Sequence, residues 1–375
     1  MRKAIFKREM ESSFRTFSVS DDIQAKVLKI LFENPLDITK QYLLKENFTS
    51  AQLIADVLQA VIKEEKLIAD ICSLFQIDDD LELPFPLREQ LARKEKIAVI
   101  VGAGISRFLG APLWEELSTM AIKYLHEKNL LTFAEAEKII VENISPKQKM
   151  SIFHEILPKN STLDFYERIF TGTKGKRNPY DDLVMLDMPK FTLNIDHHFW
   201  NALERKCLKD GQKGTKPIHA FIDFKEDTPI VNNCIYQIHG SYKNLARYSI
   251  ITMRDYLDYY FSATELRRFL KRVFSEYAFI FLGCGMEEFE ILQELVKSGK
   301  QHHVLLGTYL SDTNLLRIRK NYFQKTLGVN AYGYYLDFNG YDRLLNVIDS
   351  WVKKINFEIN GGFYTKTGEF NDVKL

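Results

Sequence analysis

Short apolar runs alternate with longer amphipathic stretches from about residue 96 onward. The first run, Ile97–Val101, is unbroken and rich in β-branched residues, as expected for a central strand buried on both faces. Further runs predict strands at 190–195, 234–238, 278–282, 303–306 and 332–338. Helical spacing of apolar residues separates them, for example over 264–274, 287–297 and 341–355. This alternation predicts an α/β fold with a doubly wound, mainly parallel, Rossmann-like sheet.

The first part of the chain follows a different pattern. Residues 1–92 carry helical stripes only, and a capping box at Thr49 and Gln52 begins one of the helices. The acidic and proline-containing stretch Asp78–Pro86 is typical of a linker. We therefore predict an N-terminal all-helical domain for assembly or partner docking. The predicted division is 1–92 for this domain, 93–355 for the α/β domain, and 356–375 for an unassigned tail.

A second helical region interrupts the α/β pattern. Thr132 with Glu135, and Ser145 with Pro146 and Gln148, have the spacing of helix starts. We predict a helical insertion at about 128–188, placed over one end of the sheet as a substrate lid often is.

Composition narrows the function classes. The chain is 46% hydrophobic and 27% charged with a net charge of +1, which gives no global electrostatic reason to expect direct nucleic-acid binding or a membrane surface. No apolar run reaches the length of a membrane span, and no signal-peptide core follows the first residues, so we expect a cytoplasmic protein. The cysteines at 72, 207, 234 and 284 form no C-x-x-C pair, so we expect free thiols and no metal site.

A glycine turn follows the first apolar run. The segment is Gly102-Ala103-Gly104-Ile105-Ser106, and a helical pattern with Pro112 in its first turn comes after it. A strand, a glycine turn and a helix point backbone N–H groups at a phosphate, which predicts a nucleotide diphosphate site. The fingerprint of ordinary dehydrogenases is incomplete, because Arg107 breaks it and no acidic residue follows at the expected distance. The alternative is a turn that only starts a helix.

Polar residues follow three other predicted strands. Asn194 and Asp196 come after one, His239 after the next, and Gly283-Cys284 after a third. In a doubly wound sheet these strand ends converge on one crevice. A histidine is a base near neutral pH, and an asparagine holds a sugar hydroxyl or positions a water. Asp196 would fix an arginine, a backbone turn or the charge on the sugar. The alternatives are a structural histidine, a capping asparagine and a cysteine that only packs.

The ordered set of these segments resembles the sirtuin family. The glycine turn continues as Gly110-Ala111-Pro112-x-Trp114, and Leu193–Asp196 and Ile238–Ser241 follow in the family's order. Deacylating sirtuins typically carry a four-cysteine zinc module after the catalytic His-Gly, which is absent here. The chain resembles the sirtuin-like NAD hydrolases of bacterial antiphage defence over roughly residues 93–350. Residues 249–256, SIITMRDY, match the pattern that these proteins show in place of the zinc module.

This resemblance implies an activity. It implies an NAD+ glycohydrolase that acts as an NAD-depleting effector of antiphage defence by abortive infection, with NAD as substrate. It implies catalytic roles for His239, Asn194 and Asp196. The implied cofactor-binding residues are Gly102, Ala103, Gly104, Ile105, Ser106, Trp114, Asn194, Asp196, Gly240, Gly283, Cys284 and Glu288. Cys284 and the glutamates at 287 and 288 depart from the family's serine and later aspartate.

Partners and alternatives also follow from the resemblance. Family members often work beside a HerA-type DNA translocase, an Argonaute protein or a nucleotide sensor, and we expect a homo-oligomer. An NAD-dependent protein deacylase is the first alternative, and it would need an open groove for an acyl-lysine peptide. A non-catalytic module that senses NAD or ADP-ribose derivatives is the second.

Overall fold

The computed structural model describes residues 80–360, with gaps at 158, 172–176, 211–217, 221–223, 233, 245–248, 262–263, 310–311 and 338–339. The predicted N-terminal helices, with the capping box at Thr49, lie outside the described residues, as does the chain beyond residue 360. The division into domains at residue 92 therefore stays a prediction. The described residues form two compact units: the first contains 80–84, 306–319 and 332–351, and the second contains 85–305, 320–331 and 352–360.

A seven-stranded sheet runs through the described chain in the order β3-β4-β2-β1-β5-β6-β7. The neighbouring strands from β3 to β6 in this order pair in parallel. The strands are β1 (Ile97–Val101), β2 (Lys190–Thr192), β3 (Ile218–Ala220), β4 (Ile235–Gln237), β5 (Ala278–Leu282), β6 (His302–Thr308) and β7 (Val329–Tyr335). The predicted parallel α/β fold is confirmed.

Strand β1 is the centre of this arrangement. All five of its residues are buried, and it pairs with β2 on one side and β5 on the other. A strand with a neighbour on both edges and helices on both faces exposes no side to water, so every position is apolar.

Some boundaries differ from those predicted. The strands β2 and β4 are shorter than their apolar runs, and β7 begins at Val329 and ends at Tyr335, about three residues earlier than expected. The sequence did not predict β3. This strand has only the segment Ile218–Ala220 and pairs on one side with β4, so it is too short to show a two-residue period.

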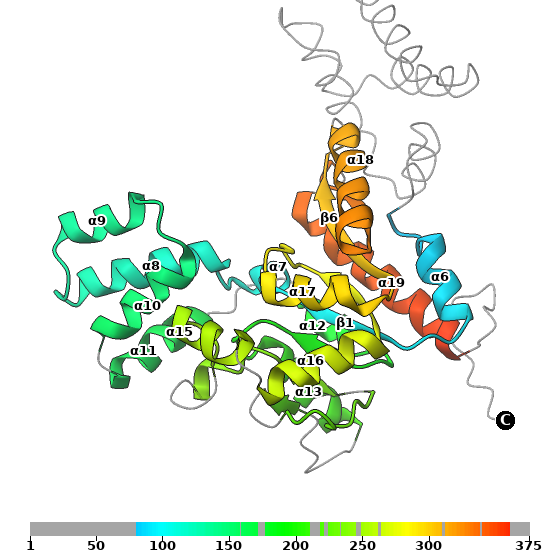
Figure 1. Cartoon of the computed structure of the whole chain (residues 1–375), viewed down its shortest axis with the longest axis horizontal. Coiled ribbons are helices and arrows are strands. Elements are labelled where there is room, and N and C mark those ends of the chain that lie inside the picture. Colours follow the sequence, from blue (N-terminus) through cyan, green and yellow to red (C-terminus); the bar gives the residue numbers. More distant parts are fainter. Residues whose placement is uncertain are drawn as a thin grey trace, which may run out of the picture. The chain divides into compact units, whose positions relative to one another are not determined.

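Helices flank the sheet (Figure 1). Their bounds are α6 (Phe85–Ala92), α7 (Ala103–Ser106), α8 (Trp114–Glu127), α9 (Phe133–Val141), α10 (Pro146–Ile156), α11 (Lys159–Phe170), α12 (Pro179–Leu183), α13 (His198–Lys209), α15 (Met253–Tyr256), α16 (Glu265–Glu276), α17 (Phe289–Ser298), α18 (Thr313–Tyr322) and α19 (Arg343–Asn360). Among the described residues, no helix is long and apolar enough to cross a membrane.

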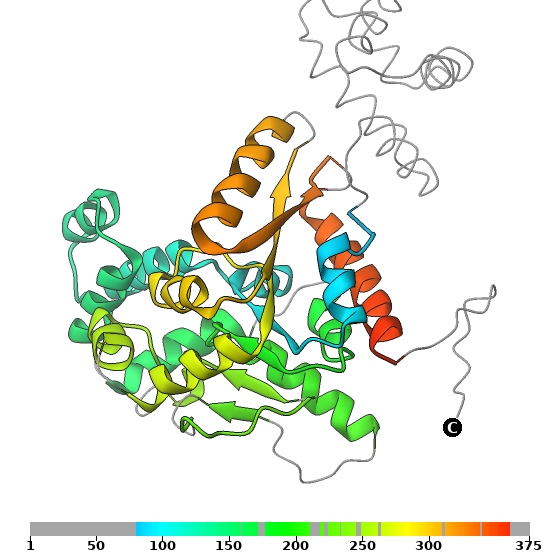
Figure 2. The ribbon, with the colours of Figure 1, turned by 45° about the vertical axis from the view of Figure 1, so that its right-hand side comes forward.

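The predicted helix starts in the insertion are confirmed. The Thr132 side chain accepts a hydrogen bond from Glu135 N at the start of α9, and Ser145 does the same for Gln148 N at the start of α10. Both ribbon views show α8, α9, α10 and α11 gathered beside one another (Figure 1, Figure 2).

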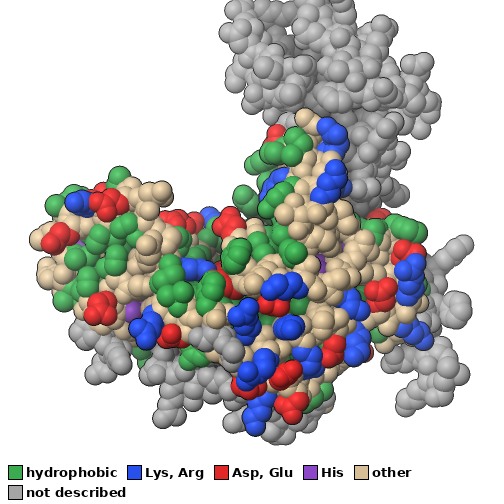
Figure 3. Space-filling view, viewed as in Figure 1, with side chains coloured by type: hydrophobic (Ala, Val, Ile, Leu, Met, Phe, Trp, Pro, Cys, Tyr) green, Lys and Arg blue, Asp and Glu red, His purple; other side chains and the backbone are tan. Residues whose placement is uncertain are grey.

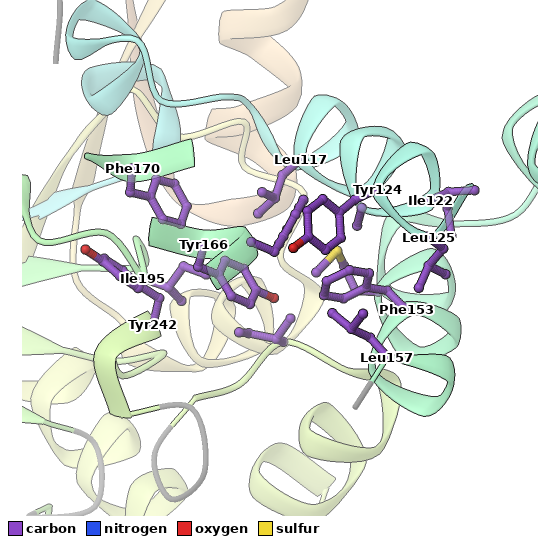
Figure 4. Close-up of a cluster of buried hydrophobic side chains, with 14 of the residues drawn as sticks. Leu117, Ile122, Tyr124, Leu125, Phe153, Leu157, Tyr166, Phe170, Ile195 and Tyr242 are labelled. Carbon is purple, nitrogen blue, oxygen red and sulfur yellow. The ribbon is translucent and has the colours of Figure 1, made fainter. Parts of the chain in front are cut away.

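An apolar cluster holds these helices together (Figure 4). Its centre is aromatic: the rings of Tyr124 and Phe165 lie 5.2 Å apart, and those of Phe153 and Phe165 lie 4.6 Å apart. The same cluster includes Ile195 and Tyr242. The helical insertion therefore packs directly on the two chain segments that carry the predicted catalytic residues.

The outer surface of the insertion also carries apolar side chains. Phe133 is 65% exposed and Val141 is 80% exposed, and Figure 3 shows apolar groups among charged ones over these helices. Some apolar residues of the insertion are therefore exposed on its surface and are not part of its core.

The first unit contains a buried ion pair. The sequence placed Asp80 in a linker, but the structure buries this carboxylate, which bonds Arg343 and accepts a hydrogen bond from Tyr335 N at 3.0 Å. Trp351 Nε1 donates to the Asp80 carbonyl at 3.0 Å. Asp80 thus belongs to a packed core, because its charge is compensated on several sides.

Candidate functional site

The polar segments predicted from the sequence follow four adjacent strands. In the sheet order β4-β2-β1-β5, His239 follows β4, Asn194 follows β2, Gly102 follows β1 and Gly283 follows β5. The strands run parallel, so these residues share one edge of the sheet. The chain extends the sheet from β1 toward β2 and β4, and then returns to add β5 on the other side of β1. Ligands of doubly wound folds bind at such a reversal.

The turns after β1 and β5 touch through their backbones. Gly104 N donates to Gly283 O at 3.0 Å, and Gly102 N donates to Leu282 O at 3.0 Å. A Cβ on Gly104 would lie 2.9 Å from Gly283 O, and one on Gly102 would lie 2.6 Å from the same oxygen. Gly283 has a φ of +63°, which favours glycine. Glycine is therefore needed here for the close approach of two turns.

This contact changes the expected account of the diphosphate site. Ile105 N donates to Gly102 O at 3.1 Å, so the amides of residues 102, 104 and 105 all have backbone acceptors. The short helix α7 follows the turn, and the longer α8 begins only at Trp114, which leaves Pro112 outside its first turn. The predicted strand, glycine turn and helix exist. The expectation that the turn points free N–H groups at a phosphate is wrong for residues 102, 104 and 105, because their amides already donate to backbone carbonyls.

A directional chain of hydrogen bonds joins the end of β2 to the turn after β1. Ser106 Oγ donates to Asp196 Oδ2 at 2.6 Å, which leaves its oxygen to accept from Tyr180 OH at 2.6 Å. Asn194 Nδ2 in turn lies 3.0 Å from Tyr180 OH. Each hydroxyl donates one proton, and the Asp196 carboxylate at the end of the chain only accepts. The donors therefore run from Asn194 to Tyr180, from Tyr180 to Ser106, and from Ser106 to Asp196.

The orientation of the Asn194 amide is fixed by its neighbours. Nδ2 lies 3.0 Å from Gly102 O, which only accepts hydrogen bonds, so this atom must be the nitrogen. Thr192 Oγ1 accepts from Asn194 N at 3.0 Å and holds the backbone. Within the described part of the chain, Asn194 Oδ1 receives no hydrogen bond. Asn194 thus has one carbonyl oxygen, held in place, that is available for a further hydrogen bond.

Asp196 anchors this chain of hydrogen bonds. It is 5% exposed, and its Oδ1 accepts from His198 N at 2.9 Å. Of the roles expected for it, the structure fits the fixing of a backbone turn, together with Ser106. Burial, and then the Asp196 charge, raise the pKa of Tyr180 well above its usual value, so the phenol keeps its proton and its place as a donor.

The His239 side chain is buried and has polar neighbours. It is 4% exposed, and its Nε2 is 2.9 Å from Tyr260 OH. Burial above all, and then the Lys147 ammonium, lower the pKa of His239 to about 4, against Glu290 and a hydrogen bond with the Leu193 backbone, which raise it. At neutral pH the ring is therefore uncharged, and burial makes it a weaker base than a free histidine. Leu193 directly precedes Asn194, so the backbone links the two predicted catalytic residues.

A lysine of the insertion braces the surroundings of His239. Lys147 Nζ, on α10, lies 3.1 Å from Glu290 and 3.3 Å from Glu288. The same ammonium is 3.6 Å from the centre of the Tyr256 ring, which lies 5.6 Å from the His239 ring. Glu288, expected to contact the cofactor, is here the partner of Lys147.

The other predicted cofactor residues have mixed environments. Ile105 is fully buried, Ala103 is partly buried, and Gly240 has a φ of +72° that suits glycine. Trp114 packs against the apolar cluster, with a buried Nε1 that has no partner among the described residues. Burial, and then Glu288, raise the pKa of Cys284 to about 12, so its thiol stays protonated. This supports packing for Cys284 over nucleophilic chemistry.

Sequence reasoning missed Tyr180, Tyr260 and Lys147. Asn178 and Pro179 do signal a helix start, and Asn178 caps α12, but nothing in that pattern indicates that Tyr180 reaches Ser106. Tyr260 and Lys147 are equally ordinary in the sequence. Each contacts residues distant along the chain, so only the folded structure reveals their role.

Comparison with protein families gives one match to this chain. A family model described as a SIR2-like domain matches residues 190–331. The matched range begins at β2 and contains Asn194, His239 and Gly283, whereas the turn after β1 lies before it. No curated protein matches the chain. The match supports a sirtuin-like family and an NAD-related activity.

Proposed function

We propose that the protein is an NAD+ glycohydrolase, which cleaves the nicotinamide–ribose bond to give ADP-ribose and nicotinamide. The observation that carries the proposal is the pair of Asn194 and His239 at the ends of β2 and β4. Asn194 offers an oriented carbonyl oxygen, and His239 is a neutral base. Both lie in the range that matches a SIR2-like domain.

Hydrolysis of NAD+ requires an oriented water and a base, and Asn194 and His239 can fill these two roles. The bond from C1′ of the ribose to the nicotinamide nitrogen breaks, its electron pair goes to that nitrogen, and the cationic ring becomes neutral. A water oxygen bonds to C1′ and loses a proton. Asn194 Oδ1 accepts a hydrogen bond from this water or from a sugar hydroxyl and orients it. His239 takes the proton, and a positioned base contributes about 10²–10⁴-fold in rate.

A protein deacylase would use the same residues but also needs space for an acylated lysine. Against it stands the apolar cluster, in which insertion residues such as Tyr166 and Phe170 pack on Tyr242, next to the His239 segment. A non-catalytic sensor would not need an oriented amide and a neutral base together. The role as an effector of antiphage defence, with the partners named above, rests on the sequence resemblance and is proposed with the activity.

Incubation of the purified full chain with NAD+, with and without an acetylated peptide, tests the activity. We expect nicotinamide and ADP-ribose in equal amounts and at the same rate in both reactions. His239→Ala should lower the rate at least about 10²-fold. The matched control is His126→Ala, because His126 is an exposed histidine of α8. Cleavage only with the peptide would indicate a deacylase, and binding without cleavage would indicate a sensor.

A further inference from the structure

The base nitrogen of His239 is already occupied. Nε2 lies 2.9 Å from Tyr260 OH, and both side chains are buried, at 4% and 6% exposure. The ring also forms a hydrogen bond with the Leu193 backbone that raises its pKa, as donation to a carbonyl does. A neutral imidazole with its one proton on that side has a lone pair on Nε2. Tyr260 is then the donor, and its hydroxyl lies between His239 and any substrate approaching Nε2.

The position of Tyr260 is strongly held. It lies in the short π-helical segment Leu257–Phe261, and its ring stacks on Tyr256 at 5.8 Å with an interplanar angle of 23°. Lys147 covers Tyr256 and is itself paired with Glu288 and Glu290. Elements α10, α15 and α17 thus support the tyrosine from several directions. Burial, and then Glu288 and Glu290, raise its pKa well above the usual value, so the phenol is protonated at neutral pH.

Tyr260 is also the member of the pair that borders open space. It lines a small hollow of about 10 Å³, room for one water-sized sphere, together with Phe261 and residues of α16 and α17. His239 does not line this hollow. The tyrosine accordingly separates the buried imidazole from a space that reaches solvent.

We propose that Tyr260 is a further catalytic residue, through which His239 receives the proton of the attacking water or sugar hydroxyl. The substrate O–H bond breaks and its proton goes to the Tyr260 oxygen, while the Tyr260 proton moves to His239 Nε2. The tyrosine is neutral before and after the step, and the imidazole ends protonated. This proposal rests on the proposed function, because it describes how that reaction loses its proton.

The variant Tyr260→Phe removes one oxygen and keeps the stacked ring. We expect kcat for NAD+ cleavage to fall at least about 10²-fold, with KM within a few-fold of the parent. Tyr334→Phe is the matched control, because Tyr334 has the same 6% exposure as Tyr260 and its hydroxyl has no hydrogen bond to His239 among the described residues. Its kcat should stay within a few-fold of the parent. Tyr260→Phe activity equal to or above the parent's would overturn the proposal, and an increase would mean that Tyr260 blocks the base.

A second measurement does not depend on cleavage. In ¹⁵N-histidine-labelled full chain, the resonance of His239, assigned by its loss in His239→Ala, should shift in Tyr260→Phe and stay unchanged in Tyr334→Phe. No shift would mean that the hydroxyl does not bond Nε2, and the relay would be wrong. If the parent chain cleaves no NAD+ while the shift occurs, the proposed function fails and the His239–Tyr260 contact stands.

Discussion

At the scale of single residues, the predicted catalytic side chains already form hydrogen bonds with other groups of the protein. Asn194 donates through its nitrogen to backbone and side-chain oxygens, and its other atom is left for a ligand. His239 is buried and bonded, where the sequence suggested a residue lining an open cleft. Its replacement therefore costs stability as well as activity, about 1–3 kcal/mol for the buried partner left unpaired.

The glycine contact gives the first residue prediction. In Gly104→Val, the new side chain meets the Gly283 backbone, so the two turns must separate. We expect NAD+ affinity measured by calorimetry to fall at least about 10-fold, with a lower melting temperature. Gly285→Ala is the control, because its Cβ would meet only ordinary contacts at 3.7 Å. Unchanged affinity in folded Gly104→Val would show that this turn does not shape the cofactor site.

The chain of hydrogen bonds from Asn194 to Asp196 gives the second residue prediction. Tyr180→Phe removes the hydroxyl between Asn194 and Ser106, which keep a direct contact of 3.0 Å. We expect a loss of unfolding free energy of about 0.5–1.5 kcal/mol and a reduced kcat, because the amide loses one of its supports. Denaturant unfolding and steady-state kinetics measure both. Tyr322→Phe, at a tyrosine that is 54% exposed, should change neither; equal behaviour of the two variants would contradict a role for Tyr180.

At the scale of elements, α10 acts on the site through one side chain. The capping box of Ser145 and Gln148, with Pro146 as the first helical residue, sets the start of the helix, so Lys147 is in its first turn and reaches α17. Strand ends matter in the same way. The Thr192 hydroxyl donates to Val101 O and accepts from Asn194 N, which ends β2 before its apolar run is finished.

The α10–α17 contact is open to a direct test. Lys147→Met leaves the Glu290 carboxylate, whose side chain is 7% exposed, without its ammonium. We expect a loss of about 1–3 kcal/mol, below the value for a fully buried pair because the Lys147 side chain is 22% exposed. Lys138→Met, on a lysine that is 75% exposed, should cost under about 0.5 kcal/mol. If Lys147→Met unfolds at the parental denaturant concentration, the ion pair does not hold the elements together.

At the scale of the molecule, buried neutral histidines link stability to pH. His302 Nδ1 accepts from Phe279 N at 3.1 Å, and Gln90 Oε1 lies 2.7 Å from His303 Nε2. Burial is the main cause that lowers the pKa of His302 to about 4 and that of His303 to about 3. The unfolded chain, with ordinary histidine pKa values near 6.5, binds protons first as the pH falls.

The sign follows from that difference. Above about pH 6.5 neither state is protonated at these rings, and between about 6.5 and 4 only the unfolded state is, so acid lowers the unfolding free energy. Each ring contributes about 1.4 kcal/mol per pH unit in that window. We expect the melting temperature to fall from pH 7 to pH 5, and to fall less steeply in His303→Gln. His126→Gln should follow the parent. A constant or rising melting temperature toward pH 5 would contradict this account.

The sequence by itself determined the order and type of the elements. Ile97–Val101 and Ala278–Leu282 were predicted with the observed bounds, because a strand buried on both faces is a continuous apolar run. The starts of α9 and α10 were predicted because a capping box is a local hydrogen-bond pattern. The parallel sheet also placed Asn194 and His239 at one edge. Only the tertiary structure decided which residues come into contact at that edge. Gly102 and Gly104 pack against Gly283, and Lys147 joins α10 to α17. Tyr180 contacts Asn194, and Tyr260 contacts His239. These contacts join residues far apart in the chain, and no local spacing encodes which of many buried tyrosines or lysines will be brought to the site.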